Sequence, residues 1–282
     1  MSTLAMRFPN GLAKALTLSY DDAVQEDFRL IDIMKQYGLK GTFNINSSRY
    51  REDGYYKETD SKIARRMSIE KATALYGQDG IEPALHGLTH PFLESLPKAQ
   101  VAYEIIKDRE NLERQFGHIV RGMAYPYGTF NDDVIRVLDD CGIVYCRTVH
   151  ATGKFDIPTN WLRLDPTCHH LDSRLPELTK KFVETVPGND RQPWMFYVWG
   201  HAYEFAERDN WEIIENFAKN VSGKEDVWYA TNIEIYEYVE NFKRLVFTLD
   251  QTRVKNPTAQ DLWFVTRKKL YCIPAGATIE LN

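Results

Sequence analysis

Short apolar runs alternate along most of this chain with segments whose apolar residues recur at a spacing near 3.6 residues. The runs are typical of buried β-strands, and the periodic segments are typical of amphipathic helices. Such alternation favours a parallel sheet with right-handed crossovers, and about eight units in a chain of this length match a (β/α) barrel. We therefore predict an α/β fold, an irregular, TIM-like (β/α) barrel with seven or eight strands. The strand candidates are residues 15–20, 41–45, 82–86, 122–125, 143–146, 161–164, 195–199 and 227–230.

An open, doubly wound sheet is the alternative architecture. No G-x-G-x-x-G pattern follows the first strand candidate, and this weakens the dinucleotide-binding form of that fold. After Phe242 the pattern changes, because three short strand candidates follow one another with no helix between them, at 245–249, 262–266 and 270–273. We predict a barrel over residues 1–245 and a short β-rich extension over residues 246–282 that covers the bottom or an edge of the barrel.

Charge and composition exclude several classes of function. The chain carries 35 Lys+Arg against 40 Asp+Glu and has no long basic cluster, so we expect no nucleic-acid partner. Its apolar runs are far too short to cross a bilayer, so we expect no membrane partner. The amino-terminal residues lack the charged-then-apolar pattern of a secretory signal, and the four cysteines form no C-x-x-C pair. These features predict a cytoplasmic protein.

Polar residues follow four of the strand candidates where the strand ends. In a (β/α) barrel the chemistry collects at the carboxyl ends of the strands, so these residues are the first candidates for a site. They are Asp21 and Asp22, His86 and His90, the turn Tyr125-Pro126-Tyr127-Gly128, and His201.

The two carboxylates and the two histidines suggest a metal site. Side chains alternate along a strand, so Asp21 and Asp22 face different ways, and one can bind a cation while the other points toward substrate. They could equally be helix N-cap residues. His86 and His90 lie four apart and can converge on a helix face or in a turn. With one carboxylate they supply the ligand count of a catalytic zinc site, although one core and one surface histidine is the plainer interpretation.

The remaining two motifs offer a hydrogen-bond donor and an acid. The rigid turn around Tyr127 can aim a backbone N–H into the cavity, although it could also be a plain loop. His201 follows an aromatic strand and is a candidate general acid. His169 and His170 come after Cys168, and we interpret them as loop residues rather than a metal cluster.

Taken in order, Ser19-Tyr20-Asp21-Asp22-Ala23, His86-Gly87-Leu88-Thr89-His90, Tyr125-Pro126-Tyr127-Gly128 and Trp199-Gly200-His201 resemble the motifs of the polysaccharide deacetylase family, over about residues 12–243. The domain is the one seen in chitooligosaccharide deacetylases, which are carbohydrate esterases. The resemblance implies an irregular barrel that removes N- or O-acetyl groups from sugars with a divalent metal, zinc first among the candidates. It also implies roles for single residues. The metal ligands are Asp22, His86 and His90; the general base is Asp21, the general acid is His201, and the oxyanion donor is the Tyr127 backbone N–H.

Three departures from the family pattern stand out. Ala23 replaces the usual Gly, Gly87 follows the first histidine, and Ala124 replaces an Arg that orients the catalytic Asp. We hypothesise that Arg163 takes over from that Arg, because it falls inside a strand candidate that should line the barrel.

The leading hypothesis is a metal-dependent hydrolase that removes an N- or O-linked acetyl group from a carbohydrate. The predicted location favours small or intracellular substrates. One alternative is a metal-independent hydrolase of non-peptide C–N bonds in small cyclic amides, and another is a non-catalytic sugar-binding barrel. Aromatic residues make up 13% of the chain and suit either a large core or a sugar-binding cleft. The predicted substrate-binding residues are Tyr125, Arg163, Trp199 and Tyr203.

Overall fold

A computed structural model describes residues 4–52 and 65–281 of the chain. Its centre is a curled parallel sheet with the strand order β6-β5-β4-β3-β2-β8-β7, and β9 pairs with β2 outside this path. All of these strands run parallel, so the predicted α/β class and irregular barrel are confirmed. The strands are β2 (Lys14–Asp21), β3 (Gly41–Ile45), β4 (Ile81–Leu85), β5 (Gly122–Ala124), β6 (Tyr145–Arg147), β7 (Cys168–His169), β8 (Trp194–Gly200) and β9 (Val227–Tyr229).

Strand β2 is the axis of the sheet, and it is buried along its whole length. One edge pairs with β8 from Lys14 to Tyr20. The other edge pairs with β9 near the start of β2 and with β3 near its end. Because β3 and β9 share this edge, the sheet splits there, and the barrel is irregular.

The gap between β6 and β7 is bridged by a short segment without a full strand. Leu164 forms a parallel bridge with Arg147 of β6, and Thr167 donates its backbone N–H to Tyr197 of β8 at 2.8 Å. The predicted strand at 161–164 is wrong, because Trp161–Arg163 is a 3-10 helix, η4. Asn160 caps this helix by accepting the Leu162 N–H at 3.0 Å, which favours a turn over an extended chain.

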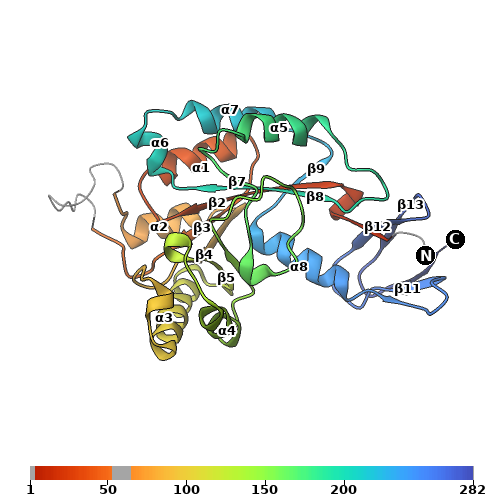
Figure 1. Ribbon diagram of the computed structural model, residues 1–282, viewed down its shortest axis with the longest axis horizontal. Helices are drawn as coiled ribbons and strands as arrows, with labels where there is room; N and C mark the ends of the chain where they lie inside the picture. Colours follow the sequence, from red (N-terminus) through yellow and green to blue (C-terminus); the bar gives the residue numbers. More distant parts are fainter. Residues whose placement is uncertain (1–3, 53–64, 282) are drawn as a thin grey trace.

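The described residues form eight α-helices. Figure 1 shows α1, α5, α6 and α7 on one side of the parallel sheet and α3 and α4 on the other. Among the described residues, no helix combines the length and apolar character needed to cross a bilayer. The helices are α1 (Asp27–Gln36), α2 (Ile69–Tyr76), α3 (Lys98–Phe116), α4 (Asp132–Asp140), α5 (Leu175–Glu184), α6 (Tyr203–Glu207), α7 (Glu212–Val221) and α8 (Asn232–Lys243).

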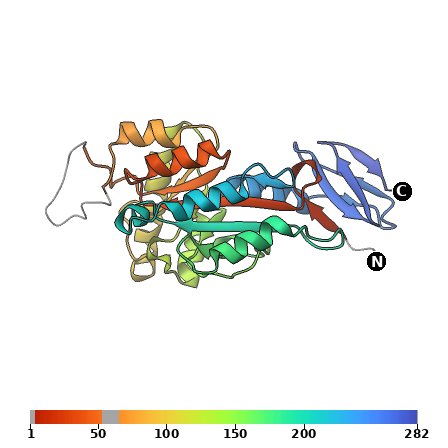
Figure 2. The same ribbon diagram turned by 90° about the horizontal axis from the view of Figure 1, so that it is seen from above.

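Two small antiparallel sheets lie together at one end of the molecule (Figure 2). One has the order β1-β12-β13 and the other β10-β11-β14. Strand β1 comes from the amino terminus just before β2, so these sheets lie toward the amino ends of the parallel strands. The carboxyl ends, where the candidate residues lie, are left open. The strands are β1 (Ala5–Arg7), β10 (Val246–Phe247), β11 (Arg253–Lys255), β12 (Leu262–Thr266), β13 (Lys269–Ile273) and β14 (Thr278–Glu280).

Candidate metal centre

The chain turns sharply at the end of β2, and this turn separates the two carboxylates. Asp21 is the last strand residue, and the Asp22 N–H donates to the Asn44 carbonyl of β3 at 3.0 Å. Asp22 has a φ of 85° and Ala23 a φ of 51°, both in the left-handed region that side chains disfavour. The strand therefore ends at once, and Asp22 is aimed differently from Asp21.

Asp22, His86 and His90 come together as the sequence predicts. One ligand atom from each lies within 4.8 Å of the others. The two histidine Nε2 atoms are 3.2 Å apart, and His90 Nε2 is 3.9 Å from Asp22 Oδ1. Donor atoms around a tetrahedral zinc ion, each about 2.0–2.2 Å from it, are separated by about 3.3 Å. The three residues therefore fit one small divalent ion.

A hydrogen bond to Nδ1 orients the His86 ring and leaves its Nε2 atom free to bind that ion. His86 Nδ1 lies 2.9 Å from the Ala124 carbonyl, so it carries the proton and Nε2 keeps its lone pair. Burial lowers the pKa of His86, and it lowers the pKa of His90 to about 4. Both rings are therefore neutral near pH 7, which is the form that binds metals. Burial works against ionisation of Asp22, but Arg66, 2.7 Å away, and the nearby histidines hold its pKa well below the usual range.

The loop between the two histidines is fixed from several sides. Asn46 donates to the carbonyls of His86 and Gly87, at 2.5 and 2.8 Å. Thr89 donates its backbone N–H and its hydroxyl to Glu104 of α3, both at 2.8 Å. The loop needs this support because His90 has a φ of 60°, a left-handed conformation that is strained for a residue with a side chain, whereas Gly87 adopts its φ of 74° without strain.

Asp21 is buried, and Arg147 holds it. The guanidinium of Arg147 contacts both carboxylate oxygens of Asp21, and Asn44 donates to Asp21 Oδ1 at 2.8 Å. Burial would raise the pKa of Asp21, but Arg147 and the neighbouring histidines outweigh it and lower the pKa. Asp21 Oδ2 lies 3.7 Å from His86 Nε2 and 3.7 Å from His201 Nε2, so this carboxylate stands between the two histidine groups.

The hypothesis that Arg163 orients Asp21 is wrong. Arg163 lies on η4 with a half-exposed side chain, and it pairs with Asp132 at the start of α4. Arg147 takes that place because it is the last residue of β6, directly after the strand candidate at 143–146. The rule that identified the other polar residues, the first position after a strand, would also have identified Arg147.

A second group of histidines surrounds Glu204 at the end of β8. Glu204 Oε2 lies 3.3 Å from His201 Nδ1, 3.1 Å from His169 Nε2 and 3.2 Å from His170 Nε2. Burial alone would lower the pKa of His201, but the hydrogen bond to Glu204 and the charges of Asp21 and Asp22 raise it. His201 therefore holds a proton more readily than a free histidine, and its Nε2 faces Asp21.

His169, His201 and Glu204 are also close enough to hold a metal ion. The hydrogen bonding argues against it, because His169 Nδ1 accepts the Leu171 backbone N–H at 3.1 Å. The ring proton of neutral His169 is then on Nε2, which faces Glu204 and has no lone pair to offer. His169 and His170 are thus not plain loop residues, as the sequence suggested, because their Nε2 atoms lie 3.1 and 3.2 Å from Glu204. His169 is the last residue of β7 and His170 follows it directly, but a strand of two residues gives no clear signal in the sequence.

The predicted substrate-binding residues have different surroundings. Tyr125 is not accessible to a sugar, because it is 1% exposed and its hydroxyl donates to the Leu162 carbonyl at 2.8 Å. Trp199 is buried, with Arg147 over its ring at 4.4 Å. Tyr203 is half-buried, with its ring centre 5.1 Å from that of His201. Tyr127 is half exposed and has a φ of 58° in the short helix η3 (Pro126–Gly128).

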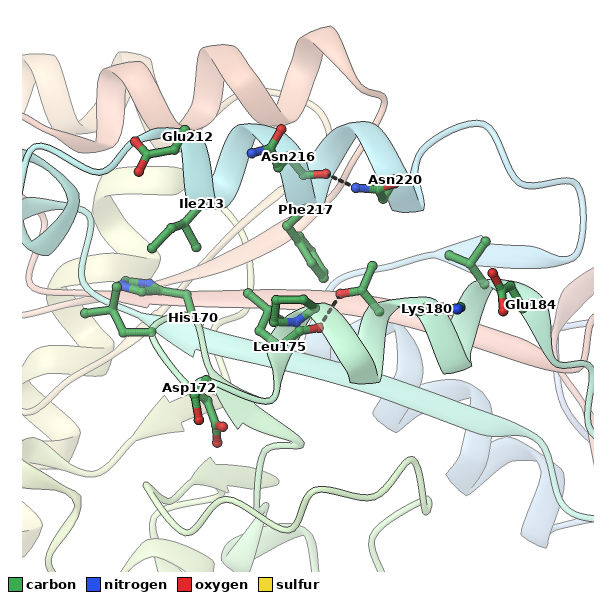
Figure 3. A pocket seen from close by; sticks show the side chains of 15 residues that line it. His170, Asp172, Leu175, Lys180, Glu184, Glu212, Ile213, Asn216, Phe217 and Asn220 are labelled. Carbon is green, nitrogen blue, oxygen red and sulfur yellow. Dashed lines mark hydrogen bonds between the residues drawn. The ribbon is translucent and has the colours of Figure 1, made fainter.

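A separate cavity of about 610 Å³ lies between α5 and α7, away from the two aspartates (Figure 3). Its walls are mainly apolar, with Leu175, Ile213 and Phe217 among them. His170 lines one end of it, and Lys180 and Glu184 lie at the other end. Apart from His170, none of the residues around Glu204 or the two aspartates lines this cavity.

The fold and the site together define a class: a parallel (β/α) barrel with an Asp-His-His cluster at the carboxyl ends of its strands. The family model for polysaccharide deacetylase matches residues 9–146, which include Asp21, Asp22, His86, His90 and Tyr127. This match covers just under half of the chain, and over that part the chain is similar to the polysaccharide deacetylase family. None of the curated proteins compared with the chain matches it.

Solved structures resemble the chain at low sequence identity, and one of them, with a TM-score above 0.5, shows the shared fold. A Mycobacterium smegmatis protein assigned to the polysaccharide deacetylases is 14% identical over 85% of this chain and 94% of its own, with a TM-score of 0.56. The Streptococcus pyogenes deacetylase PplD, in complex with acetate, is 20% identical over 52% of this chain, with a TM-score of 0.45, and the chain spans 61% of its length. A Bacillus anthracis pseudoenzyme of carbohydrate esterase family 4 is 16% identical over 82% of this chain and 68% of its own, with a TM-score of 0.48. Identities this low concern the fold and not the activity.

Proposed function

We propose that this protein is a metal-dependent hydrolase that removes an acetyl group, N- or O-linked, from a carbohydrate. One observation carries the proposal. The donor atoms of Asp22, His86 and His90 lie within 4.8 Å of one another at the carboxyl ends of β2 and β4, and Asp21 stands between them and His201. The similarity to this family adds the substrate class, an acetylated polysaccharide or a smaller sugar.

Asp22, His86 and His90 would hold the metal. A divalent ion there supplies a bound water of lowered pKa and draws electron density from the acyl oxygen. Two neutral imidazoles and one carboxylate, with the remaining position open, suit zinc best among the common biological ions. Arg66 shares Asp22 Oδ1 and keeps this carboxylate ionised.

Asp21 would accept the proton of the attacking water. Its carboxylate is ionised near pH 7, since its pKa is lowered despite burial, and Arg147 and Asn44 fix its direction. The Oδ2 atom faces both histidine groups at 3.7 Å, so a proton taken up there lies close to His201. The Arg147 contact makes Asp21 a weak but well-oriented base.

His201 would donate a proton to the departing nitrogen or oxygen of the sugar. Glu204 binds the Nδ1 side of the ring, so Nε2 is the atom directed at the reacting centre. The Tyr127 backbone N–H, in a turn of fixed left-handed geometry, would stabilise the negative charge that develops on the acyl oxygen. Such a donor typically contributes about 10²–10³ in rate.

The test combines metal analysis with acetate release. The purified chain is expected to bind close to one divalent ion, and to release acetate from members of a panel of N- and O-acetylated sugars. Release should stop with a chelator and return with zinc. Release that persists without metal would instead favour a hydrolase of C–N bonds that needs no ion. Sugar binding with no release in any metal would favour a binding barrel.

Asp22→Asn serves as the specific variant, and His118→Ala as the matched control. His118 is an exposed histidine whose one polar contact is with a neighbouring backbone carbonyl. The proposal requires that the first variant lose both the ion and the activity while the second keeps both.

A further inference from the structure

An aromatic pair and an unpaired arginine border the metal centre on the side of His90. We propose that they form a substrate subsite for a sugar residue that carries a carboxylate, so that the preferred substrate is an acidic acetylated sugar rather than a neutral one. This inference rests on the proposed function. The residues are Phe92, Tyr127 and Arg49, and none of them is a candidate metal ligand.

Phe92 and Tyr127 make an exposed platform. Their rings stack with centres 3.9 Å apart and planes 11° from parallel. The Tyr127 ring also meets His90 edge-on, at 4.3 Å between ring centres. Phe92 is 48% exposed and Tyr127 52%, so the stacked pair is open to solvent. An aromatic face has negative charge, and the C–H face of a sugar ring packs well on it. The platform therefore offers a sugar ring a surface directly beside the metal ligand His90.

The backbone around Arg49 is held in place by its own hydrogen bond and by hydrogen bonds of the neighbouring residues. It lies in the turn that follows β3, where its N–H donates to the Asn46 carbonyl at 3.0 Å. This turn is fixed to the histidine loop twice, because Asn46 donates to Gly87 and the Ser48 N–H donates to Leu88 at 3.3 Å. These hydrogen bonds join the turn to the loop, and Arg49 lies close enough to His90 and Tyr127 for its charge to act on both.

The charge of Arg49 is not neutralised within the described part of the chain. Its side chain is half-buried and has no hydrogen bond or ion pair with any described residue. The other two arginines of the centre differ, because Arg66 pairs with Asp22 and Arg147 pairs with Asp21. Burial lowers the pKa of Arg49, and the nearby charge of Arg66 lowers it further, while Asp22 and the Tyr127 phenol act in the opposite direction.

The charge balance identifies the ligand chemistry. Among the described residues each aspartate of the centre already has its own arginine, so Arg49 is in excess there, and a bound divalent ion would add to the same positive field. A guanidinium that is partly desolvated and unpaired is costly unless an anion completes it. Arginine binds carboxylates with two parallel hydrogen bonds, which fixes orientation as well as adding affinity. A carboxylate on the sugar that stacks on Phe92 and Tyr127, or on its neighbour, would complete this site.

Matched sugars test this inference. N-Acetylglucosamine is neutral, N-acetylglucosaminuronic acid carries a carboxylate at C6, and the 3-O-lactyl ether of N-acetylglucosamine carries one at C3. The dissociation constant of each is measured by calorimetry on the full chain in zinc-containing buffer. Acetate release is measured in parallel, so that binding and turnover are separate readouts.

At least one acidic sugar is expected to bind about tenfold more tightly than the neutral one, as befits a charge-assisted hydrogen bond. Arg49→Gln should bring that sugar to within about twofold of the neutral one. Arg136→Gln, which removes a surface arginine paired with Asp133, should leave the difference intact. Arg49→Lys keeps the positive charge but not the paired N–H donors of the guanidinium, so it should keep only part of the difference in affinity between acidic and neutral sugars.

Equal binding of all three sugars by the unaltered chain would overturn the inference, as would a difference that survives in Arg49→Gln. Phe92→Ala should weaken acidic and neutral sugars alike, and unchanged binding would remove the aromatic platform from the subsite. Preferential acidic-sugar binding with no acetate release from any sugar would leave the subsite standing and contradict the proposed function, so the two failures are distinguishable.

Discussion

The two histidine groups at the mouth of the barrel use the same residue types for opposite purposes. Next to Asp22, His86 is buried and His90 is half-buried. Both rings are neutral, and their Nε2 atoms are 3.2 Å apart. Around Glu204, the Nε2 atoms of His169 and His170 and the Nδ1 atom of His201 all lie within 3.3 Å of one carboxylate oxygen, and the pKa of His201 is raised. The first group offers lone pairs to a cation, whereas His201 of the second group offers a proton. In His86 and His201 the hydrogen bond made by Nδ1, to the Ala124 carbonyl and to Glu204, decides which, so residue type alone does not define the chemistry.

The largest expected effect is the loss of a metal ligand. His86→Ala should remove the ion and lower the rate of acetate release by at least about 10³-fold, because a metal ion contributes several kcal/mol to the transition state. Metal content and kcat/KM are measured together. His170→Ala is the matched change in the other group, and it should leave the metal content unchanged. Equal metal loss in both variants would mean that the two groups do not divide their roles as proposed.

Arg147 holds the carboxylate that separates the two groups, and its removal should affect stability most. Arg147→Met leaves Asp21 charged, buried and without its partner, which should lower the free energy of unfolding by about 3–5 kcal/mol. Arg163→Met removes an exposed ion pair with Asp132 and should cost no more than about 1 kcal/mol. Denaturant unfolding of both variants measures the two values. Similar losses would show that the Asp21 contact is not a buried ion pair of the kind described.

Glu204→Gln should separate proton donation from metal binding. Glu204 is among the causes that raise the pKa of His201, so its replacement should lower that pKa. The acid form of His201 would then be lost at a lower pH, and the alkaline limb of the kcat/KM profile should move to lower pH. We expect a loss of about 10–100-fold at pH 8, with unchanged metal content. A profile that keeps its alkaline limb in the variant would contradict the role of His201 as the acid.

Sequence reasoning identified the metal side of the site better than the acid side. Asp22 directly follows β2, His86 directly follows β4, and His90 lies four residues after His86. Their convergence therefore follows from the ends of parallel strands meeting at one edge of a barrel. Arg147 and the Glu204 group depend on β6 and β7, which are only three and two residues long. Strands this short carry little periodicity, and the turn capped by Asn160 was therefore interpreted as a strand.

The C-terminal extension contains strands that the spacing of apolar residues along the chain does not predict. Its three predicted strands have counterparts in β10, β12 and β13, but two more, β11 and β14, are short and irregular in composition. Strand β1 joins β12 from the opposite end of the chain, and such pairing leaves no trace in the spacing of neighbouring residues. The barrel was predictable because its order follows the chain, and the small sheets were less so because theirs does not.

The smallest expected effect concerns backbone strain at the two strand ends. On the metal side Ala23 has a φ of 51°, where an L-residue costs about 1–2 kcal/mol relative to glycine. On the acid side the last residue of β8 is Gly200, and there the constraint is steric, because a Cβ would lie 2.0 Å from His170 Nδ1. Ala23→Gly should relieve the strain but add freedom to the unfolded chain, for a net gain of about 0.5–1 kcal/mol.

Thermal unfolding measures this gain as a rise in Tm of about 2 °C for a chain of this size. Gly200→Ala is the matched change in the opposite direction, and it should lower Tm because His170 must move out of its contact with Glu204. A fall in Tm for Ala23→Gly would mean that the left-handed turn after Asp22 is held by its surroundings without strain. The difference between the two strand ends would then lie in their hydrogen bonds alone.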